Sequence, residues 1–182
     1  LRCLVGSEMC IRDRSIMAHI AVLGLGNWGS AIARLWLLDG HKVKGWTIEQ
    51  EVYESITMEG MNHKYLPDHS LDGLEATMHV EDALDGSEII VLALPSSVIL
   101  NVVEDIIQYL RPGHVLLDLA KGLAPGKRLI SEAIHQMLND NNMHNPLAIL
   151  TGPTIAPEAA GGVMTTALVA SEDMSVADKL AS

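Results

Sequence analysis

The sequence predicts an α/β fold in which helices cover both faces of a doubly wound, mostly parallel sheet. Short apolar runs rich in β-branched residues alternate with amphipathic helical patterns, and glycine or proline punctuates the junctions. Strands that alternate with helices of about 10–15 residues are typical of βαβ units. Since 48% of the 182 residues are hydrophobic, the chain can form one domain with a substantial core.

The charge and hydropathy pattern excludes several kinds of partner. The formal net charge is −11, and the 12 Lys and Arg residues form no basic cluster, so neither nucleic acid nor an anionic membrane surface is expected as a partner. The longest apolar run, Ile89–Leu94, is far shorter than the roughly 20 residues that span a bilayer. No membrane insertion and no metal site are predicted.

The two ends of the chain do not resemble the rest of it. Residues 1–16 contain both cysteines and show neither a helical nor a strand period, so we interpret them as a non-native or disordered leader before a start at Met17. A translated adaptor sequence and a natural disordered tail are the two alternatives. Residues 173–182 have the pattern of an amphipathic helix without a Gly or Asn cap. We therefore expect a C-terminally truncated domain over residues 17–182, and a reducing, cytoplasmic compartment.

Local patterns predict the elements of the N-terminal half in order. The helix that follows the first strand has apolar residues at helical spacing and Gly40 as its C′ residue, and the next helix is closed by Gly60. The predicted elements are a strand at His19–Leu25, a helix at Trp28–Asp39, a strand at Lys42–Thr47, a polar helix at Glu49–Glu59, a loop at Met61–Pro67 and a weak strand near Leu74–His79.

The C-terminal half continues the alternation. The strongest strand pattern, Glu88–Leu94, is stopped by Pro95, and Ser96 or Ser97 is expected to cap the next helix. The apolar face of that helix is Ile99, Val102, Val103, Ile106 and Leu110. After a turn at residues 111–113, the predicted elements are a strand at Val115–Leu119, a helix at Lys127–Leu138, a strand at Leu147–Leu150 and a short helix at Ile155–Ala160.

A glycine-rich motif stands directly between the first strand and the first helix. Gly24-Leu-Gly26-Asn-Trp-Gly29 fits the pattern G-x-G-x-x-G. In that pattern the first glycine permits a tight turn, the second lets the backbone approach a pyrophosphate, and the third lets helix and strand pack closely. The helix N-terminus offers its N–H groups to the phosphates. The motif predicts dinucleotide binding; a turn that binds nothing is the alternative, and Trp28 departs from the methyltransferase pattern G-x-G-x-G.

Dinucleotide-binding sequences of this type also contain an acidic residue about 20 positions after the glycines, and its carboxylate binds the ribose 2′-hydroxyl. Glu49 stands 20 residues after Gly29, although it is equally compatible with the start of a polar helix. No Arg lies within residues 46–51 to favour a 2′-phosphate, but Lys44 is near. NAD is therefore slightly preferred over NADP.

Three more strand ends carry unusual residues, and ligands bind at the edge where the carboxyl ends of parallel strands meet. The segments are Pro95-Ser96, Ala120-Lys121-Gly122 and Thr151-Gly-Pro-Thr154. Lys121 is expected in a cleft, where its ammonium would hold a phosphate or polarise a carbonyl oxygen; a surface lysine is the alternative. The Thr151–Thr154 turn either binds an anion or simply caps the short helix after it.

From Met17 to its end the chain resembles the N-terminal half of bacterial NAD(P)-dependent glycerol-3-phosphate dehydrogenases. The resemblance rests on Asn62-x-Lys64-Tyr-Leu-Pro67 followed in order by LPS, KG and GPTIAPE. It implies a Rossmann-type NAD(P)-binding domain without the family's helical C-terminal domain. The expected cofactor-binding residues are Gly24, Gly26, Asn27, Trp28, Gly29, Glu49, Pro95, Lys121 and Ala156. The substrate-binding residues implied are Lys121, Gly152 and Thr154, with Lys121 as the catalytic group.

The resemblance implies that the parent enzyme interconverts dihydroxyacetone phosphate and sn-glycerol 3-phosphate for glycerophospholipid synthesis, and a homodimer of the full-length protein is compatible with it. The proton-accepting lysine of the family lies beyond this chain, so we expect cofactor binding without competent catalysis. Ile48 occupies the family's basic or polar cofactor-contacting position, a departure that leaves the choice between NAD and NADP open. Two alternatives remain, a ketopantoate-reductase-like or hydroxy-acid dehydrogenase and a non-catalytic NAD-sensing module.

Overall fold

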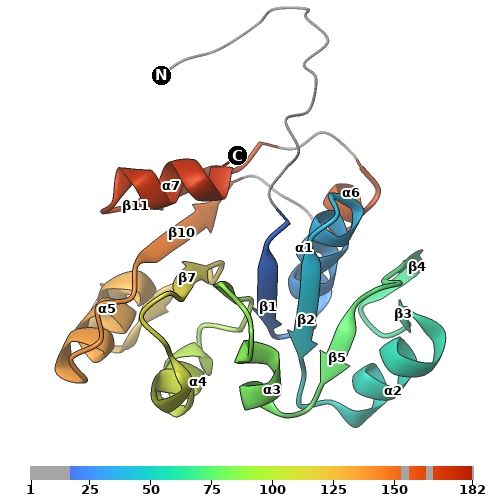
Figure 1. Ribbon diagram of the computed structural model, residues 1–182, viewed down its shortest axis with the longest axis horizontal. Helices are drawn as coiled ribbons and strands as arrows, with labels where there is room; N and C mark the ends of the chain where they lie inside the picture. Colours follow the sequence, from blue (N-terminus) through green and yellow to red (C-terminus); the bar gives the residue numbers. More distant parts are fainter. Residues whose placement is uncertain (1–16, 153–155, 163–165, 182) are drawn as a thin grey trace, which may run out of the picture.

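The computed structural model describes residues 17–152, 156–162 and 166–181, so the predicted leader at residues 1–16 lies outside the described part (Figure 1). The strands are β1 (His19–Leu23), β2 (Lys42–Trp46), β3 (Met61–Asn62), β4 (Leu66–Ser70), β5 (Glu75–Thr77), β6 (Ile89–Leu92), β7 (Val115–Asp118), β8 (Leu123–Ala124), β9 (Arg128–Leu129), β10 (Leu147–Thr151) and β11 (Leu168–Ser171). The helices are α1 (Asn27–Leu38), α2 (Gln50–Glu59), α3 (Val80–Leu84), α4 (Ile99–Ile106), α5 (Ile130–Asp140), α6 (Ala156–Ala160) and α7 (Met174–Ala181), with 3₁₀ turns η1 (Ile107–Tyr109) and η2 (Pro125–Lys127).

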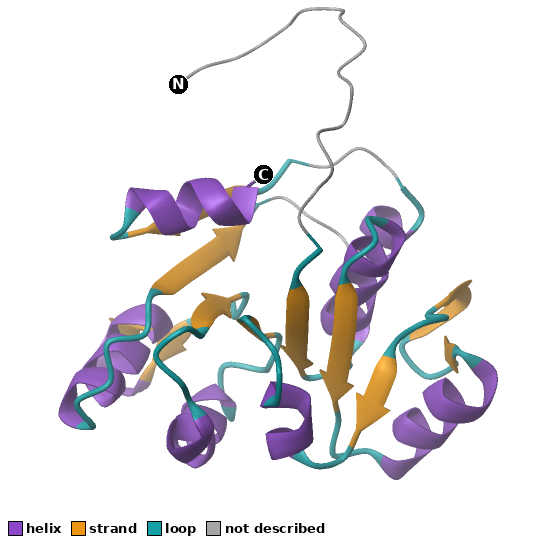
Figure 2. Ribbon diagram, viewed as in Figure 1, coloured by secondary structure: helices purple, strands orange, loops and turns teal. Residues whose placement is uncertain are grey.

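The central sheet confirms the predicted fold class. Its strand order is β11-β10-β7-β6-β1-β2-β5, and all neighbouring strands are parallel except the β10–β11 pair. Figure 2 shows the helices on both sides of the strands. The order runs outward in both directions from β1, as in doubly wound sheets, and the reversal of direction lies between β1 and β6.

Two apolar cores cover the two faces of the sheet. Successive residues of a strand point to opposite faces, so Ile20 and Val22 of β1 join one core while Ala21 and Leu23 join the other. The first core also receives buried residues of α1, α2, α6 and α7, and the second receives those of α3, α4 and α5. None of the helices in the described ranges has both the length and the apolar character needed to cross a bilayer.

Both glycines predicted to end helices do so. Gly40 follows α1 with a φ of +90°, and Gly60 is the C-cap of α2 with a φ of +64°, a left-handed conformation that suits glycine. The predicted helix over 127–138 begins three residues later, at Ile130, because a short β8–β9 hairpin precedes it. The helix expected to include Leu110 is shorter than predicted, because α4 ends at Ile106 and the 3₁₀ turn η1 follows it. The other predicted helices and strands lie within two residues of their predicted bounds.

Other predictions were incomplete or wrong. Neither Ser96 nor Ser97 caps α4; its N-cap is Val98, without a side-chain cap hydrogen bond, because residues 95–98 form a turn closed by the Pro95 carbonyl. The segment expected as a loop forms the antiparallel β3–β4 ribbon. Strand β11 and helix α3 carry patterns too short to predict, and tertiary packing against β10 and β1 stabilises them.

Candidate functional site

The loop between β1 and α1 has the backbone geometry that its glycines predict. Gly24 has a φ of +102°, a left-handed conformation that costs glycine little. A Cβ on Gly24 would lie 2.6 Å from the Ala93 carbonyl oxygen, and a Cβ on Gly29 would overlap the Gly24 carbonyl oxygen. Both positions therefore require glycine, the first for the turn and the second for the close approach of α1.

Gly26 differs from these two glycines because a Cβ added to it would meet nothing within 4 Å. It is the N-cap of α1 and no side chain caps the helix, while the adjacent Asn27 is exposed and Trp28 packs at the edge of the core. The N–H groups of a first helical turn have no partners within the helix and carry the positive end of its dipole. Open space beside these donors suits a pyrophosphate, so the loop fits the dinucleotide that its sequence predicts.

One buried side chain, Asn62 of β3, ties this loop to the β3–β4 ribbon. Asn62 is 0% exposed, and its Nδ2 donates hydrogen bonds of 2.9 Å to the Leu25 carbonyl oxygen and 2.9 Å to the Ser30 hydroxyl. Its Oδ1 accepts a hydrogen bond of 3.2 Å from the Tyr65 backbone N–H. The amide therefore fixes the glycine-rich loop and the segment after β3 in one arrangement.

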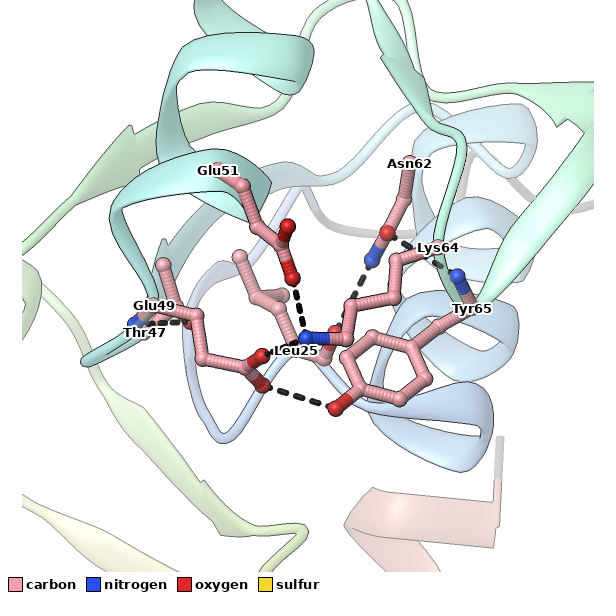
Figure 3. Close-up of polar contacts among 7 residues, drawn as sticks. All are labelled: Leu25, Thr47, Glu49, Glu51, Asn62, Lys64 and Tyr65. Atoms are coloured by element: carbon pink, nitrogen blue, oxygen red, sulfur yellow. Dashed lines mark hydrogen bonds and ion pairs between the residues drawn. The ribbon is translucent and has the colours of Figure 1, made fainter.

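A polar cluster stands at the end of β2 (Figure 3). The Glu49 carboxylate accepts hydrogen bonds from the Lys64 ammonium at 2.5 Å and from the Tyr65 hydroxyl at 2.8 Å, and Lys64 also pairs with Glu51. The hydrogen bond from Lys64, followed by that from Tyr65, holds the pKa of Glu49 below its ordinary value. Glu49 is also the N-cap of α2, which confirms the prediction that it starts a polar helix; its binding of a ribose stays a prediction.

The loops that follow β6 and β7 lie beside the glycine-rich loop, since β1, β6 and β7 are adjacent and parallel. Backbone hydrogen bonds continue past the strands, from the Ala93 N–H to the Leu23 carbonyl at 2.9 Å. A Cβ on Gly122 would lie 3.4 Å from the Ser96 side chain. The junctions after β1, β6 and β7 therefore meet at one edge of the sheet, and β10 ends at the same edge.

The sequence over this whole arrangement matches one known family. A sequence model described as NAD-dependent glycerol-3-phosphate dehydrogenase N-terminus matches residues 19–177. The chain belongs to this family. Membership decides against the alternative of a dehydrogenase from another family.

Individual members of the glycerol-3-phosphate dehydrogenase family support the assignment. The chain is 35% identical to glycerol-3-phosphate dehydrogenase (NAD(P)+) of Halothermothrix orenii over 164 residues. This alignment covers 89% of this chain and 47% of that protein. The corresponding protein of Halorhodospira halophila is 37% identical over 163 residues, 87% of this chain and 47% of that protein. The crystal structure of glycerol-3-phosphate dehydrogenase from Coxiella burnetii superposes with a TM-score of 0.82 at 28% identity, over 90% of this chain and 50% of that one. The chain spans about half the length of the relatives it matches.

The cofactor-binding and substrate-binding residues implied by the resemblance differ in their exposure and in how far the structure describes them. Lys121 follows β7 at the expected edge of the sheet, and it is exposed there. Pro95 is exposed, and Ala156 is half-buried at the start of α6. Gly152 directly follows β10, and a Cβ on it would lie 2.6 Å from the Thr166 carbonyl oxygen. Thr154 lies outside the described residues.

Two residues near β2 bear on the choice between NAD and NADP. The Lys44 ammonium, considered as a partner for a 2′-phosphate, donates instead to the carbonyl oxygens of Asp82 at 3.1 Å and Asp85 at 2.9 Å. It thereby binds the carboxyl end of α3, which carries the negative end of a helix dipole. Ile48 is 75% exposed, so it contributes little to the core.

A buried carboxyl group stands at the end of β7. Asp118 is 2% exposed and its Oδ1 accepts a hydrogen bond of 2.8 Å from the Ala120 N–H, which shapes the turn before Lys121. Burial raises the pKa of Asp118 to about 6, because an ionised carboxylate is poorly solvated there. Sequence reasoning missed Asp118, as well as the contacts of Asn62, Lys64 and Tyr65. The ordered motif Asn62-x-Lys64-Tyr was the available signal for the last three.

Proposed function

We propose that this chain is the dinucleotide-binding half of an NAD(P)-dependent glycerol-3-phosphate dehydrogenase, with residues 17–182 as the domain. The open space beside Gly26 and the helix N-terminus supports this proposal most directly, together with family membership. The parent enzyme interconverts dihydroxyacetone phosphate and sn-glycerol 3-phosphate, as a cytoplasmic homodimer that supplies glycerophospholipid synthesis. The bound nicotinamide supplies or accepts the hydride.

In this proposal the residues of the chain position the reactants. The N–H groups at the start of α1 bind the pyrophosphate, and the Glu49 carboxylate binds the adenosine ribose, which favours NAD. Lys121 holds the substrate phosphate and stabilises negative charge on the reacting oxygen, with Gly152 and Thr154 beside it. The exposed ammonium of Lys121 is accessible to a phosphorylated three-carbon substrate at the carboxyl edge of the sheet.

The proposal is tested by titrating the 182-residue chain with NADH and NADPH and following the nicotinamide and tryptophan fluorescence. We expect saturable binding by the wild type. Gly26→Ala should abolish it with little loss of stability, since the added Cβ meets no protein atom but occupies the space assigned to the pyrophosphate. Gly113→Ala is the matched control, because its Cβ also meets nothing within 4 Å and it lies before β7, at the opposite edge. Equal binding by both variants contradicts the assigned site.

The substitution Lys121→Ala in a full-length version of the protein distinguishes a catalytic dehydrogenase from a non-catalytic NAD-sensing module. An enzyme loses turnover while retaining most of its NAD binding, because the ammonium acts on the substrate. A non-catalytic NAD-sensing module shows no turnover before the substitution, and its response to NAD hardly changes after it. Turnover that is unaffected by Lys121→Ala removes this residue from the proposed catalytic machinery.

A further inference from the structure

Two acidic side chains share one ammonium at the end of β2. Lys64 pairs with Glu49 at 2.5 Å and also with Glu51, and we name these three residues the acidic-lysine triad (Figure 3). The three side chains remain partly exposed, at 34% for Glu49, 44% for Lys64 and 64% for Glu51. A ligand can therefore reach all three from solvent.

The triad is held beside the glycine-rich loop by contacts on two sides. The Gly24 N–H donates a hydrogen bond of 3.0 Å to the Trp46 carbonyl oxygen, which joins the loop to the end of β2. On the other side, Asn62 stands two residues before Lys64 and donates a hydrogen bond to the Leu25 carbonyl oxygen of the loop. The triad therefore stands where the second strand of a dinucleotide-binding fold meets the adenosine ribose.

An acidic residue at this position normally favours NAD, because it accepts a hydrogen bond from the ribose 2′-hydroxyl and repels a 2′-phosphate. Here the acidic residue is not alone. The Lys64 ammonium offsets part of the charge of the two carboxylates, and its three N–H donors exceed the two carboxylate contacts it makes. The Tyr65 hydroxyl independently holds the other Glu49 oxygen at 2.8 Å, so the carboxylate keeps its place when the ammonium turns to another anion.

We propose that Lys64 is a specificity-determining residue, which allows the site to accept NADP as well as NAD by binding the 2′-phosphate in front of Glu49 and Glu51. This inference rests on the proposed dinucleotide-binding function. It assigns the tolerance for a 2′-phosphate to the turn that connects β3 and β4, which is remote in sequence from the end of β2. Glu51 opposes the effect, because it competes with the phosphate for the same ammonium.

The experiment measures dissociation constants of the 182-residue chain for NADH and NADPH by fluorescence and calorimetric titration. In Lys64→Met we expect NADPH to bind roughly tenfold more weakly, the factor that corresponds to about 1.4 kcal/mol. NADH binding should change less than about threefold, since Tyr65 still orients Glu49. Lys64→Arg should retain NADPH binding, and Glu51→Gln should strengthen it by about threefold. Lys42→Met is the matched control, because it removes an exposed ammonium at the opposite end of β2.

The outcomes separate this inference from the function on which it rests. If the wild type binds neither dinucleotide, the proposed function fails and the inference fails with it. If the wild type binds dinucleotide but Lys64→Met leaves the ratio of the two dissociation constants within twofold of the Lys42→Met ratio, the inference alone is wrong. An equal loss for NADH and NADPH also overturns it, since that result assigns Lys64 a purely structural role. Melting curves of the variants verify that each remains folded, and Glu51→Gln provides the opposite shift in a chain that retains Lys64.

Discussion

Replacing Asn62 with alanine tests the link between the buried ribbon contact and the glycine-rich loop. The substitution removes two donated hydrogen bonds of 2.9 Å and one accepted hydrogen bond of 3.2 Å from a side chain that is 0% exposed. Each buried hydrogen bond contributes about 1 kcal/mol net, so we expect Asn62→Ala to lower the free energy of unfolding by about 3 kcal/mol. In a domain of this size that loss lowers the melting temperature by roughly 6–12 °C.

The same substitution should weaken dinucleotide binding, because Asn62 holds the Leu25 carbonyl between the first two glycines of the loop. The Ser30 hydroxyl still donates to that carbonyl at 3.1 Å. The loop therefore loses its hydrogen bond to the β3–β4 ribbon and keeps the one to α1. We expect the dissociation constant for NADH to rise roughly tenfold, measured at a temperature where the variant is fully folded.

Asn145→Ala is a matched control at the other edge of the sheet. Asn145 is 6% exposed, and its Nδ2 donates to the carbonyl oxygens of Arg111 at 2.7 Å and His114 at 2.9 Å. Its loss should lower stability by about 2 kcal/mol and leave the affinity of the folded protein unchanged. The reasoning is refuted if both variants bind NADH equally well, or if Asn62→Ala unfolds within 1 kcal/mol of the wild type.

Three further predictions concern stability. Since burial raises the pKa of Asp118 from its ordinary 3.8 to about 6, the folded state keeps this proton where the unfolded chain releases it. Stability should therefore decline between about pH 4 and pH 7, by at most roughly 3 kcal/mol, and urea titrations of Asp118→Asn should lack this decline. Gly29→Ala should cost about 3 kcal/mol or more in urea unfolding, because its Cβ overlaps the Gly24 carbonyl oxygen; a loss below 1 kcal/mol contradicts the packing role. Arg34→Met should cost about 1–2 kcal/mol in thermal melts, because the guanidinium donates to backbone carbonyls of β4 at 2.6 Å and of α6 at 3.2 Å; an unchanged melting temperature contradicts it.

The elements that sequence reasoning predicted well are those whose signal is local. The β1 and β6 runs are apolar on both faces, which indicates a strand between two helical layers. The glycine-rich motif was predicted from its spacing alone, and the structure gives steric reasons for Gly24 and Gly29, while Gly26 has open space beside it. Antiparallel β11 and the β3–β4 ribbon have no such signal, because short strands form only where a partner is present.

By itself, the sequence determined the alternation of strands and helices and the glycine-rich loop, because these depend on residues within a few positions of one another. It also indicated the family, because several short motifs follow one another in a fixed order along the chain. Only the tertiary structure decided that Asn62 holds Leu25, 37 residues away, and that Lys64 and Tyr65 meet Glu49. Such contacts depend on how a ribbon without periodic pattern packs beside the sheet. The tertiary structure also decided that Asp118 is buried and Lys121 is exposed. Asp118 is still within β7 and covered by the core, whereas Lys121 lies in the loop after the strand.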